Sequence, residues 1–302
     1  MADGHVLPAR DWTARAAEHA ERADGLTAQH RERAASGESH PVWDFLFTYY
    51  SLRPRQLRVW HPGYGTVLAG EQSAEYLGRS GYVATAGGVT LDAGFLRSRI
   101  PTVRFVAALL TATAARTPQF GCFALHEWAM VYRAGDRRHQ AVPLRLGPAG
   151  TDAVVESREL RCTHFDAFRF FTTAAVARNQ NRLTRTSQVE SEQPGCLHAN
   201  MDLYKWCYKL GALVESTLLL DCLDLAFEAR QLDMQASPYD LRAYGLDPIT
   251  VEEPGGRAEY IRRQTGIVER AAPLRAALLE RCERLLAAST DRIATRSGRQ
   301  EQ

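Results

Sequence analysis

The sequence predicts a mainly α-helical fold with a small β element (α+β), built as a single compact helical domain. Segments with apolar residues at helical spacing occupy both ends of the chain, whereas glycine-rich stretches that suggest turns and short strands lie nearer the middle. Hydrophobic residues make up 45% and charged residues 24% of the 302 residues, and these proportions exclude an intrinsically disordered body.

The expected elements follow from these patterns in chain order. Residues 10–35 predict a polar amphipathic helix, and further helices are expected in a short stretch between His40 and Pro54 and over residues 101–116, 121–135, 196–210, 212–235 and 257–289. β-Hairpins are predicted near residues 58–95, which hold eight glycines, and near residues 140–163, where GPAG would form the turn. The chain then divides into an N-terminal helical segment (1–38), a main, mostly helical domain (39–289) and a frayed polar tail (290–302).

Several classes of protein are not expected from this sequence. No run of about 18 apolar residues is present, which predicts no membrane span, and the N-terminus lacks the apolar core of a secretory signal. We therefore expect a cytoplasmic protein without a membrane partner. The six cysteines include no C-x-x-C pair, which argues against a thiolate zinc ribbon, and we expect them to be reduced and mostly buried.

The basic residues are unevenly distributed in position and in type. Residues 51–190 carry 18 Arg against 10 Asp and Glu, which favours an anionic partner such as DNA or, alternatively, a solvated Arg-rich surface. The chain has 35 Arg but only two Lys, Lys205 and Lys209, which lie four residues apart. Because an amine can shift its pKa or form a Schiff base and a guanidinium cannot, we interpret Lys205 as a functional residue.

Three segments combine a histidine with carboxylates in aromatic surroundings. They are LHEWAMVYR with His126 and Glu127, THFDAFRFF with His164 and Asp166, and LHANMDLYKW with His198 and Asp202. Aromatic neighbours indicate burial, and a buried histidine or carboxylate must be hydrogen-bonded, paired or bound to a metal. We predict that the three histidines approach one cavity, where they could bind iron, manganese or zinc, although their spacing matches no metal motif.

The third segment places its polar residues on one face of a helix. His198, Asp202, Lys205 and Lys209 follow one another at intervals of three or four residues, and such residues share a stripe. The stripe is either the solvent face of the helix or the lining of a polar site. His and the only two Lys of the chain favour the site, because an ordinary solvent face here would carry Arg and Glu.

These segments also carry a family resemblance that extends from about residue 10 to about residue 285. HPVWDFLFTYYSLRPRQLRVWHPG, RCTHFDAFRFF and EQPGCLHANMDLYKWCYKL, together with SPYDL, resemble a bacterial, mainly actinobacterial, family usually labelled 3-methyladenine DNA glycosylase. The resemblance implies a DNA-repair hydrolase that excises alkylated purines by hydrolysis of the N-glycosidic bond, with DNA as partner and no cofactor.

The residues of the three segments are compatible with that chemistry. A carboxylate would stabilise the developing sugar cation or activate water, aromatic side chains would stack the flipped base, and arginines would bind phosphates. The candidate catalytic residues are Asp202, Lys205 (a conceivable amine nucleophile), Glu127 and Asp166. The candidate substrate-binding residues are Tyr204, Trp206, Trp128, Arg161 and Arg169.

Two other functions remain open from the residues alone. The first is a metal-dependent enzyme that acts on a small molecule, with His126, His164 and His198 as ligands of a transition metal (Fe, Mn or Zn). The second is a non-catalytic binding protein. Metal content and salt-sensitive DNA binding separate the glycosylase from the metal-dependent enzyme.

Overall fold

The computed structural model describes residues 5–134 and 142–297, and helices form most of this part of the chain, as the sequence predicted. The helices are α1 (Ala9–Ser36), α2 (Phe45–Tyr49), α3 (Pro54–Leu57), α4 (Ala93–Ala114), α5 (Leu125–Ala129), α6 (Gly147–Glu156), α7 (Phe165–Phe168), α8 (Thr173–Val176), α9 (Gln188–Ser191), α10 (Leu197–Leu210), α11 (Ser216–Gln235) and α12 (Pro254–Ser297). The strands are β1 (His5–Leu7), β2 (Thr66–Leu68), β3 (Tyr82–Thr85) and β4 (Gly88–Leu91).

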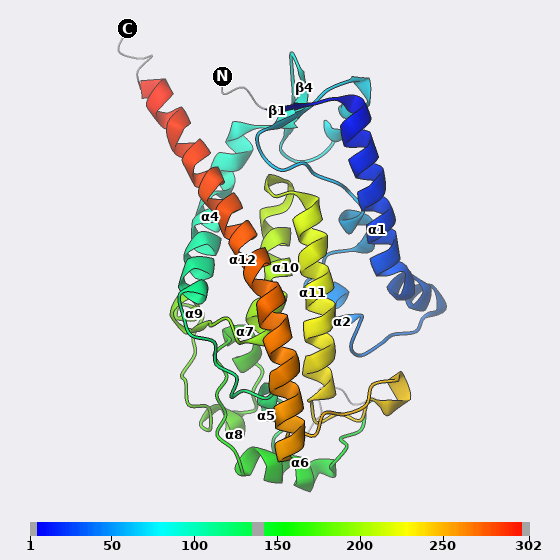
Figure 1. Cartoon of the computed structure of the whole chain (residues 1–302), viewed down its shortest axis with the longest axis vertical. Coiled ribbons are helices and arrows are strands. Elements are labelled where there is room, and N and C mark those ends of the chain that lie inside the picture. Colours follow the sequence, from blue (N-terminus) through cyan, green and yellow to red (C-terminus); the bar gives the residue numbers. More distant parts are fainter. Residues whose placement is uncertain (1–4, 135–141, 298–302) are drawn as a thin grey trace.

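Helices α4, α10, α11 and α12 pack against one another and form the centre of the molecule (Figure 1). Helix α10 is buried along almost its whole length, including the polar residues His198, Asn200 and Asp202. A helix that is surrounded on all sides belongs to the interior of a domain. The polar stripe predicted on this helix is therefore not a solvent face, apart from Lys209 at its exposed end.

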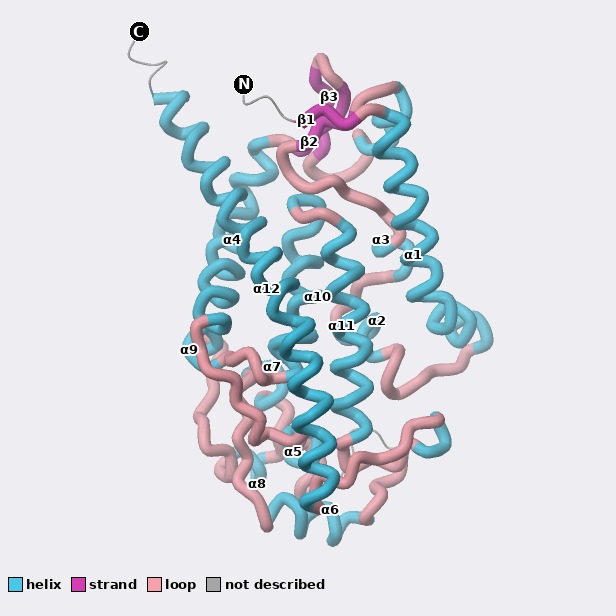
Figure 2. Tube along the Cα trace, viewed as in Figure 1, coloured by secondary structure: helices cyan, strands magenta, loops and turns pink. Residues whose placement is uncertain are grey.

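The β element is a four-stranded sheet with the order β1-β2-β4-β3, and it lies at one end of the molecule (Figure 2). Strands β3 and β4 form the hairpin predicted within residues 58–95, and β2 pairs antiparallel with β4. Gly88 allows the close approach of β4 to β2, because a Cβ there would lie 2.0 Å from the Leu68 carbonyl oxygen. Strand β1 adds parallel to β2 and was not predicted.

The second predicted hairpin, near residues 140–163, is wrong. Residues 140 and 141 lie outside the described residues, and the segment that follows contains helix α6 rather than a turn and a strand. The GPAG sequence starts this helix: Gly147 adopts φ 63°, and Pro148 takes a first-turn position where its missing N–H is not needed. The helix buries Val154 and Val155, the apolar residues that had suggested a strand.

Two predicted helix boundaries also change. Helix α4 begins at Ala93, where the Asp92 side chain accepts a hydrogen bond from the Phe95 amide, so Pro101 lies inside the helix rather than at its start. Helix α5 is only five residues long instead of spanning 121–135. The backbone of Phe123 and Ala124 has positive φ (50° and 56°), which prevents a helix from extending through them.

The C-terminal helix is longer than predicted. Helix α12 continues to Ser297, so the first part of the expected frayed tail (290–302) is helical, and residues 298–302 lie outside the described residues. No helix in the described part of the chain is both long and apolar enough to cross a membrane.

Candidate metal centre

Two groups of buried histidines and carboxylates lie between the helical core and the segment of short helices and loops at residues 117–134 and 142–196. The first trio is His126, His198 and Asp233, and the second trio is His164, Glu192 and Asp202. Within each trio, one potential ligand atom per residue lies within 4.8 Å of the other two, and all six residues are buried.

The three predicted histidines do come together. The ring of His198 stands edge-on to that of His126 with 4.5 Å between centroids, and its centroid lies 5.3 Å from that of His164. The three histidines thus converge, and His198 joins the two trios into one buried cluster of side chains, the chamber; a cavity that all three histidines line stays a prediction.

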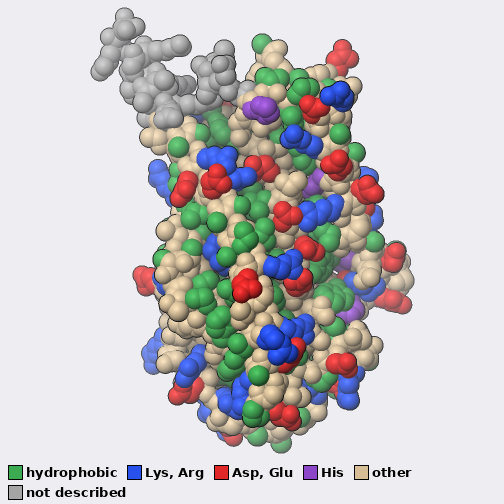
Figure 3. Space-filling view, in the orientation of Figure 1, with side chains coloured by type: hydrophobic (Ala, Val, Ile, Leu, Met, Phe, Trp, Pro, Cys, Tyr) green, Lys and Arg blue, Asp and Glu red, His purple; other side chains and the backbone are tan. Residues whose placement is uncertain are grey.

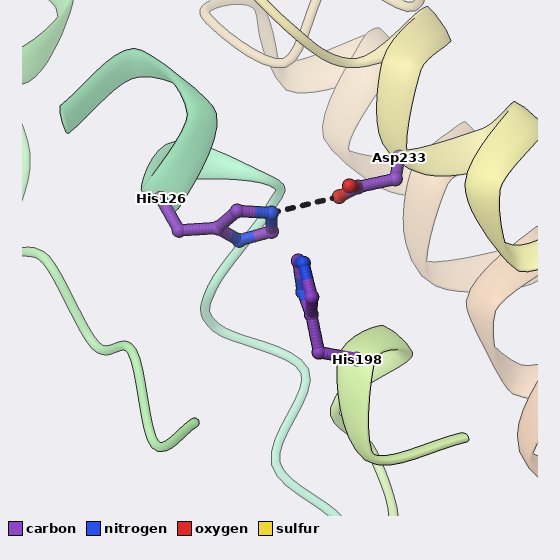
Figure 4. A group of neighbouring side chains, drawn as sticks. All are labelled: His126, His198 and Asp233. Atoms are coloured by element: carbon purple, nitrogen blue, oxygen red, sulfur yellow. Dashed lines mark ion pairs between the residues drawn. The ribbon is translucent and has the colours of Figure 1, made fainter. Parts of the chain in front are cut away.

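The first trio has the geometry of ligands around a common point (Figure 4). His126 Nε2 and Asp233 Oδ1 are both buried and form an ion pair at 2.9 Å, and neither atom has a further hydrogen-bond partner among the described residues. The side chains come from α5, α10 and α11 and point toward one another. Their potential ligand atoms therefore face one another, with His126 and Asp233 joined as an ion pair.

Neighbouring groups hold the first trio in this orientation. Cys122 Sγ lies 3.3 Å from His126 Nδ1, so the remote nitrogen of this ring has a partner and Nε2 is left for the chamber. The buried Arg230 donates to Asp233 Oδ2 at 3.3 Å and to Glu127 Oε1 at 3.0 Å, which leaves Asp233 Oδ1 facing His126.

The backbone is strained immediately before the helix that carries His126. The residues that precede its helix, Phe123 and Ala124, both adopt left-handed conformations, each of which costs a non-glycine residue on the order of 1 kcal/mol or more. Strain of this kind persists where the surrounding structure enforces it, and it is frequent at functional sites. Here it sets the direction in which α5 presents His126.

The two histidines of the first trio differ in protonation. Burial lowers the pKa of His198, and the neighbouring His126 lowers it further, so this ring is the neutral imidazole that binds metals. Burial also lowers the pKa of His126, but the Asp233 carboxylate outweighs burial and the net shift is upward. Without an ion, His126 and Asp233 therefore behave as an imidazolium–carboxylate pair.

The second trio is more completely hydrogen-bonded. His164 Nε2 lies 3.2 Å from both Glu192 Oε1 and Asp202 Oδ2. Asp202 Oδ1 accepts a hydrogen bond from the Tyr50 hydroxyl at 2.9 Å, and Glu192 Oε1 accepts one from Gln188 at 2.6 Å. These contacts fix both carboxylates beside the ring of His164.

Lys205, one turn along α10, connects the second trio to the surface. Its Nζ donates to Asp202 Oδ2 at 2.5 Å and to Asp166 Oδ2 at 2.8 Å. Burial lowers the pKa of Lys205, but the two carboxylates raise it more, and the lysine stays protonated. A permanently charged amine does not suit the nucleophile that we considered from the sequence.

A small cavity adjoins the trios. It has a volume of about 170 Å³ and combines aromatic walls, which include Phe45 and Phe170, with the polar groups of Glu127, Asp166 and His198. A larger cleft of about 660 Å³ shares Tyr49 and Asp166 with this cavity, and it is lined by Arg169, Arg185, Lys205, Lys209, Trp206 and Phe105, among others. The cleft is thus rich in cations and aromatic rings, and it lies directly outside the cavity.

The predicted substrate-binding residues separate into three groups. Trp206 and Arg169 line the cleft. Trp128 and Tyr204 are fully buried core residues, and Trp128 Nε1 donates to the Ala236 carbonyl, so neither can stack on a base without the core opening. Arg161 is exposed and pairs with Glu159.

Three central residues were missed from the sequence: Asp233, Glu192 and Arg230. Helix α11 also carries Asp221, Asp224 and Glu228, but Arg230 and Asp233 share a face with Leu223 and Ala226 at helical spacing. Two charges on that apolar face were a usable signal of a buried ion pair. Glu192 lies in a polar segment whose composition gives no sign of burial.

The distribution of charged side chains on the surface is relevant to the anionic partner expected from the sequence. On the face shown in Figure 3, Lys and Arg side chains are interspersed with Asp and Glu rather than gathered into one basic area. The concentration of cations that the structure does show is in the cleft beside Asp166.

No match to this chain was found among known protein families, curated proteins or solved structures.

Proposed function

We propose that this chain is a metal-dependent enzyme that acts on a small molecule, with a transition metal (Fe, Mn or Zn) bound by the first trio. The observation that carries the proposal is the convergence of His126, His198 and Asp233, whose potential ligand atoms are buried and lie within 4.8 Å of one another. Among the described residues, His126 Nε2 and Asp233 Oδ1 have only each other as partners, at 2.9 Å, so a cation that replaces the proton between them would bind both and His198 as well.

The donor set suits such a metal. Two imidazoles and one carboxylate are a known ligand set for non-haem iron and also fit manganese and zinc. Three protein ligands leave coordination positions for water and substrate, which a catalytic metal requires. A metal bound there would supply Lewis acidity or redox chemistry next to the cavity, which His198 also lines.

The cavity and the cleft indicate the class of substrate. A volume of about 170 Å³ is below the usual ~300–1,000 Å³ of pockets for drug-sized ligands, so the group that reaches the metal must be small. Aromatic walls favour an apolar or planar group, and the cations of the cleft favour a substrate with an anionic substituent that stays outside. Arg169 and Arg185 are the residues placed to bind that substituent.

The glycosylase function stays a prediction. One feature favours it as a second candidate: the cleft combines Arg169 and Arg185 with Trp206 next to the carboxylate of Asp166. A glycosylase of this kind would bind duplex DNA with strong salt dependence and would need no metal.

Metal analysis of the purified protein separates the two functions. We expect close to stoichiometric transition metal after anaerobic reconstitution with Fe(II), Mn(II) or Zn(II), and a loss of affinity of at least ~10-fold in His126→Ala and Asp233→Ala, because each removes a ligand. His61→Gln is the matched control, since His61 is largely buried and bonded to Tyr82 away from the trios. A protein that binds none of the three metals, but binds DNA and releases 3-methyladenine from it, would overturn the proposal.

A further inference from the structure

We infer that the second trio binds a second metal ion, so that the chamber holds a dinuclear centre. The inference rests on the proposed metal site at the first trio and adds a binding site at His164, Glu192 and Asp202. The ligand would be a second divalent transition cation of the same class.

The distance between the trios suits two ions. His198 contacts the rings of both His126 and His164, at 4.5 and 5.3 Å between centroids. In two-metal sites the ions lie roughly 3.5–4 Å apart, and adjacent histidine rings a few ångströms apart are compatible with that spacing. The two trios therefore form one chamber rather than two separate sites.

The first trio lacks a permanent cation of its own. Arg230 is the only Arg or Lys within ion-pair distance of Asp233 in the described residues, and it lies closer to Glu127. One guanidinium is thus shared by two buried carboxylates. The second ionic partner of Asp233 is His126, at 2.9 Å.

The second trio likewise contains a carboxylate without an Arg or Lys of its own among the described residues. Lys205 pairs with both Asp202 and Asp166 and neutralises Asp202. Within the described residues, no Arg or Lys lies within ion-pair distance of the buried Glu192. Its polar neighbours are His164 and Gln188. Each trio therefore contains one buried carboxylate, Asp233 or Glu192, that has no Arg or Lys of its own among the described residues.

The coordinating atoms remain accessible to an ion despite the hydrogen bonds. A carboxylate oxygen has two lone pairs, so Asp202 Oδ2 can accept from Lys205 and still face the chamber. His164 Nε2 lies equally far from the two carboxylates, at 3.2 Å, as expected for neighbouring ligands of one ion. Because Lys205 stands beside this trio and His164 Nδ1 has no hydrogen-bond partner among the described residues, we expect the second ion to be the more weakly held.

Mn(II) titration of the metal-free full chain tests the inference. We expect two ions per chain, with the second bound more weakly, and an electron paramagnetic resonance spectrum of exchange-coupled Mn(II) at saturation. His164→Ala and Glu192→Gln should each bind one ion and give the spectrum of isolated Mn(II). His61→Gln should behave as wild type.

The outcomes distinguish this inference from the proposed function. Wild-type protein that saturates at one ion would refute the second site and leave the first in place. Protein that binds no metal ion would refute both, and the trios would then be buried histidine–carboxylate ion pairs only. Because the wild-type stoichiometry decides between these outcomes, the test does not depend on any variant folding.

Discussion

Removing the charge of Lys205 should destabilise the protein through Asp202. Lys205→Met leaves the carboxylate of Asp202, which is 1% exposed, with the Tyr50 hydroxyl and His164 but without a permanent cation. Asp166 is less affected because Arg169 and Arg185 also pair with it. The cost of the substitution therefore falls mainly on one buried carboxylate.

The magnitude follows from the cost of an unpaired buried charge. Breaking a buried ion pair by removing one partner costs about 3–5 kcal/mol, and the two remaining partners of Asp202 place the expected loss at the lower end, about 3 kcal/mol. For a protein of 302 residues that corresponds to a fall in Tm of roughly 5 °C. Lys205→Arg keeps the charge but places a planar fork where a compact amine bridges two oxygens, so we expect a retained fold and at least ~10-fold weaker activity or ligand affinity, equivalent to ~1.4 kcal/mol.

Urea unfolding of the metal-free proteins measures the effect, and the chain provides a matched control. Lys209 is the other lysine of the same helix and is exposed, so Lys209→Met should change the free energy of unfolding by less than about 0.5 kcal/mol. The double variant Lys205→Met/Asp202→Asn should lose less than the single variant, because it removes the uncompensated charge. A Lys205→Met protein within about 1 kcal/mol of wild type would show that Asp202 does not depend on the lysine, and the electrostatic reasoning would fail.

Three other predictions concern acid stability, backbone strain and metal removal. Burial raises the pKa of Asp44, but its bonds to Arg33 outweigh burial and lower the pKa to about 2. The free energy of unfolding should therefore decrease by about 1–2 kcal/mol as the pH falls from about 4 to 2. Urea unfolding curves at a series of pH values should show that Asp44→Asn removes this decrease. An unchanged decrease in the variant contradicts the assignment. Ala124→Val should lower the free energy of unfolding by at least ~2 kcal/mol in the same assay, because a β-branched residue disfavours the positive φ that Ala124 adopts. Ala124→Gly should stay within about 1 kcal/mol of wild type. Equal effects of the two substitutions would contradict the strain argument. Removal of the metal by a chelator should lower the Tm, since an ion at 100-fold its Kd stabilises the native state by about 2.7 kcal/mol. It should also speed proteolysis within residues 117–196. If the Tm of protein shown to be metal-loaded does not change on chelation, the metal centre is contradicted.

The helical elements were predictable from the sequence where one local signal dominates. The amphipathic pattern of residues 10–35 and the apolar surroundings of residues 196–210 correspond to α1 and α10 within one or two residues. The errors arose where backbone conformation outweighs pattern. The GPAG segment has the composition of a turn but starts α6, and α5 is short because Phe123 and Ala124 take positive φ without glycine.

The site was predictable only from its most conspicuous residues. His126, His164, His198 and Asp202 stood out because they are polar residues among aromatic ones, and the structure brings them together. Glu192 is close to His164 only through the path of a loop that no periodicity describes. Asp233 required knowing that α11 packs beside α10, which is a property of the tertiary structure.

The origin of the six trio residues explains why this site depends on the whole fold. Helices α10 and α11 contribute His198, Asp202 and Asp233, whereas His126, His164 and Glu192 come from the segment of short helices and loops. Each trio thus contains residues from both parts of the molecule. Short helices such as α7 and α9 are not stable by themselves, so this segment must be held by its contacts with the core. An ion bound between the two parts would join them directly, and for that reason binding of metal and ordering of the segment should be thermodynamically coupled.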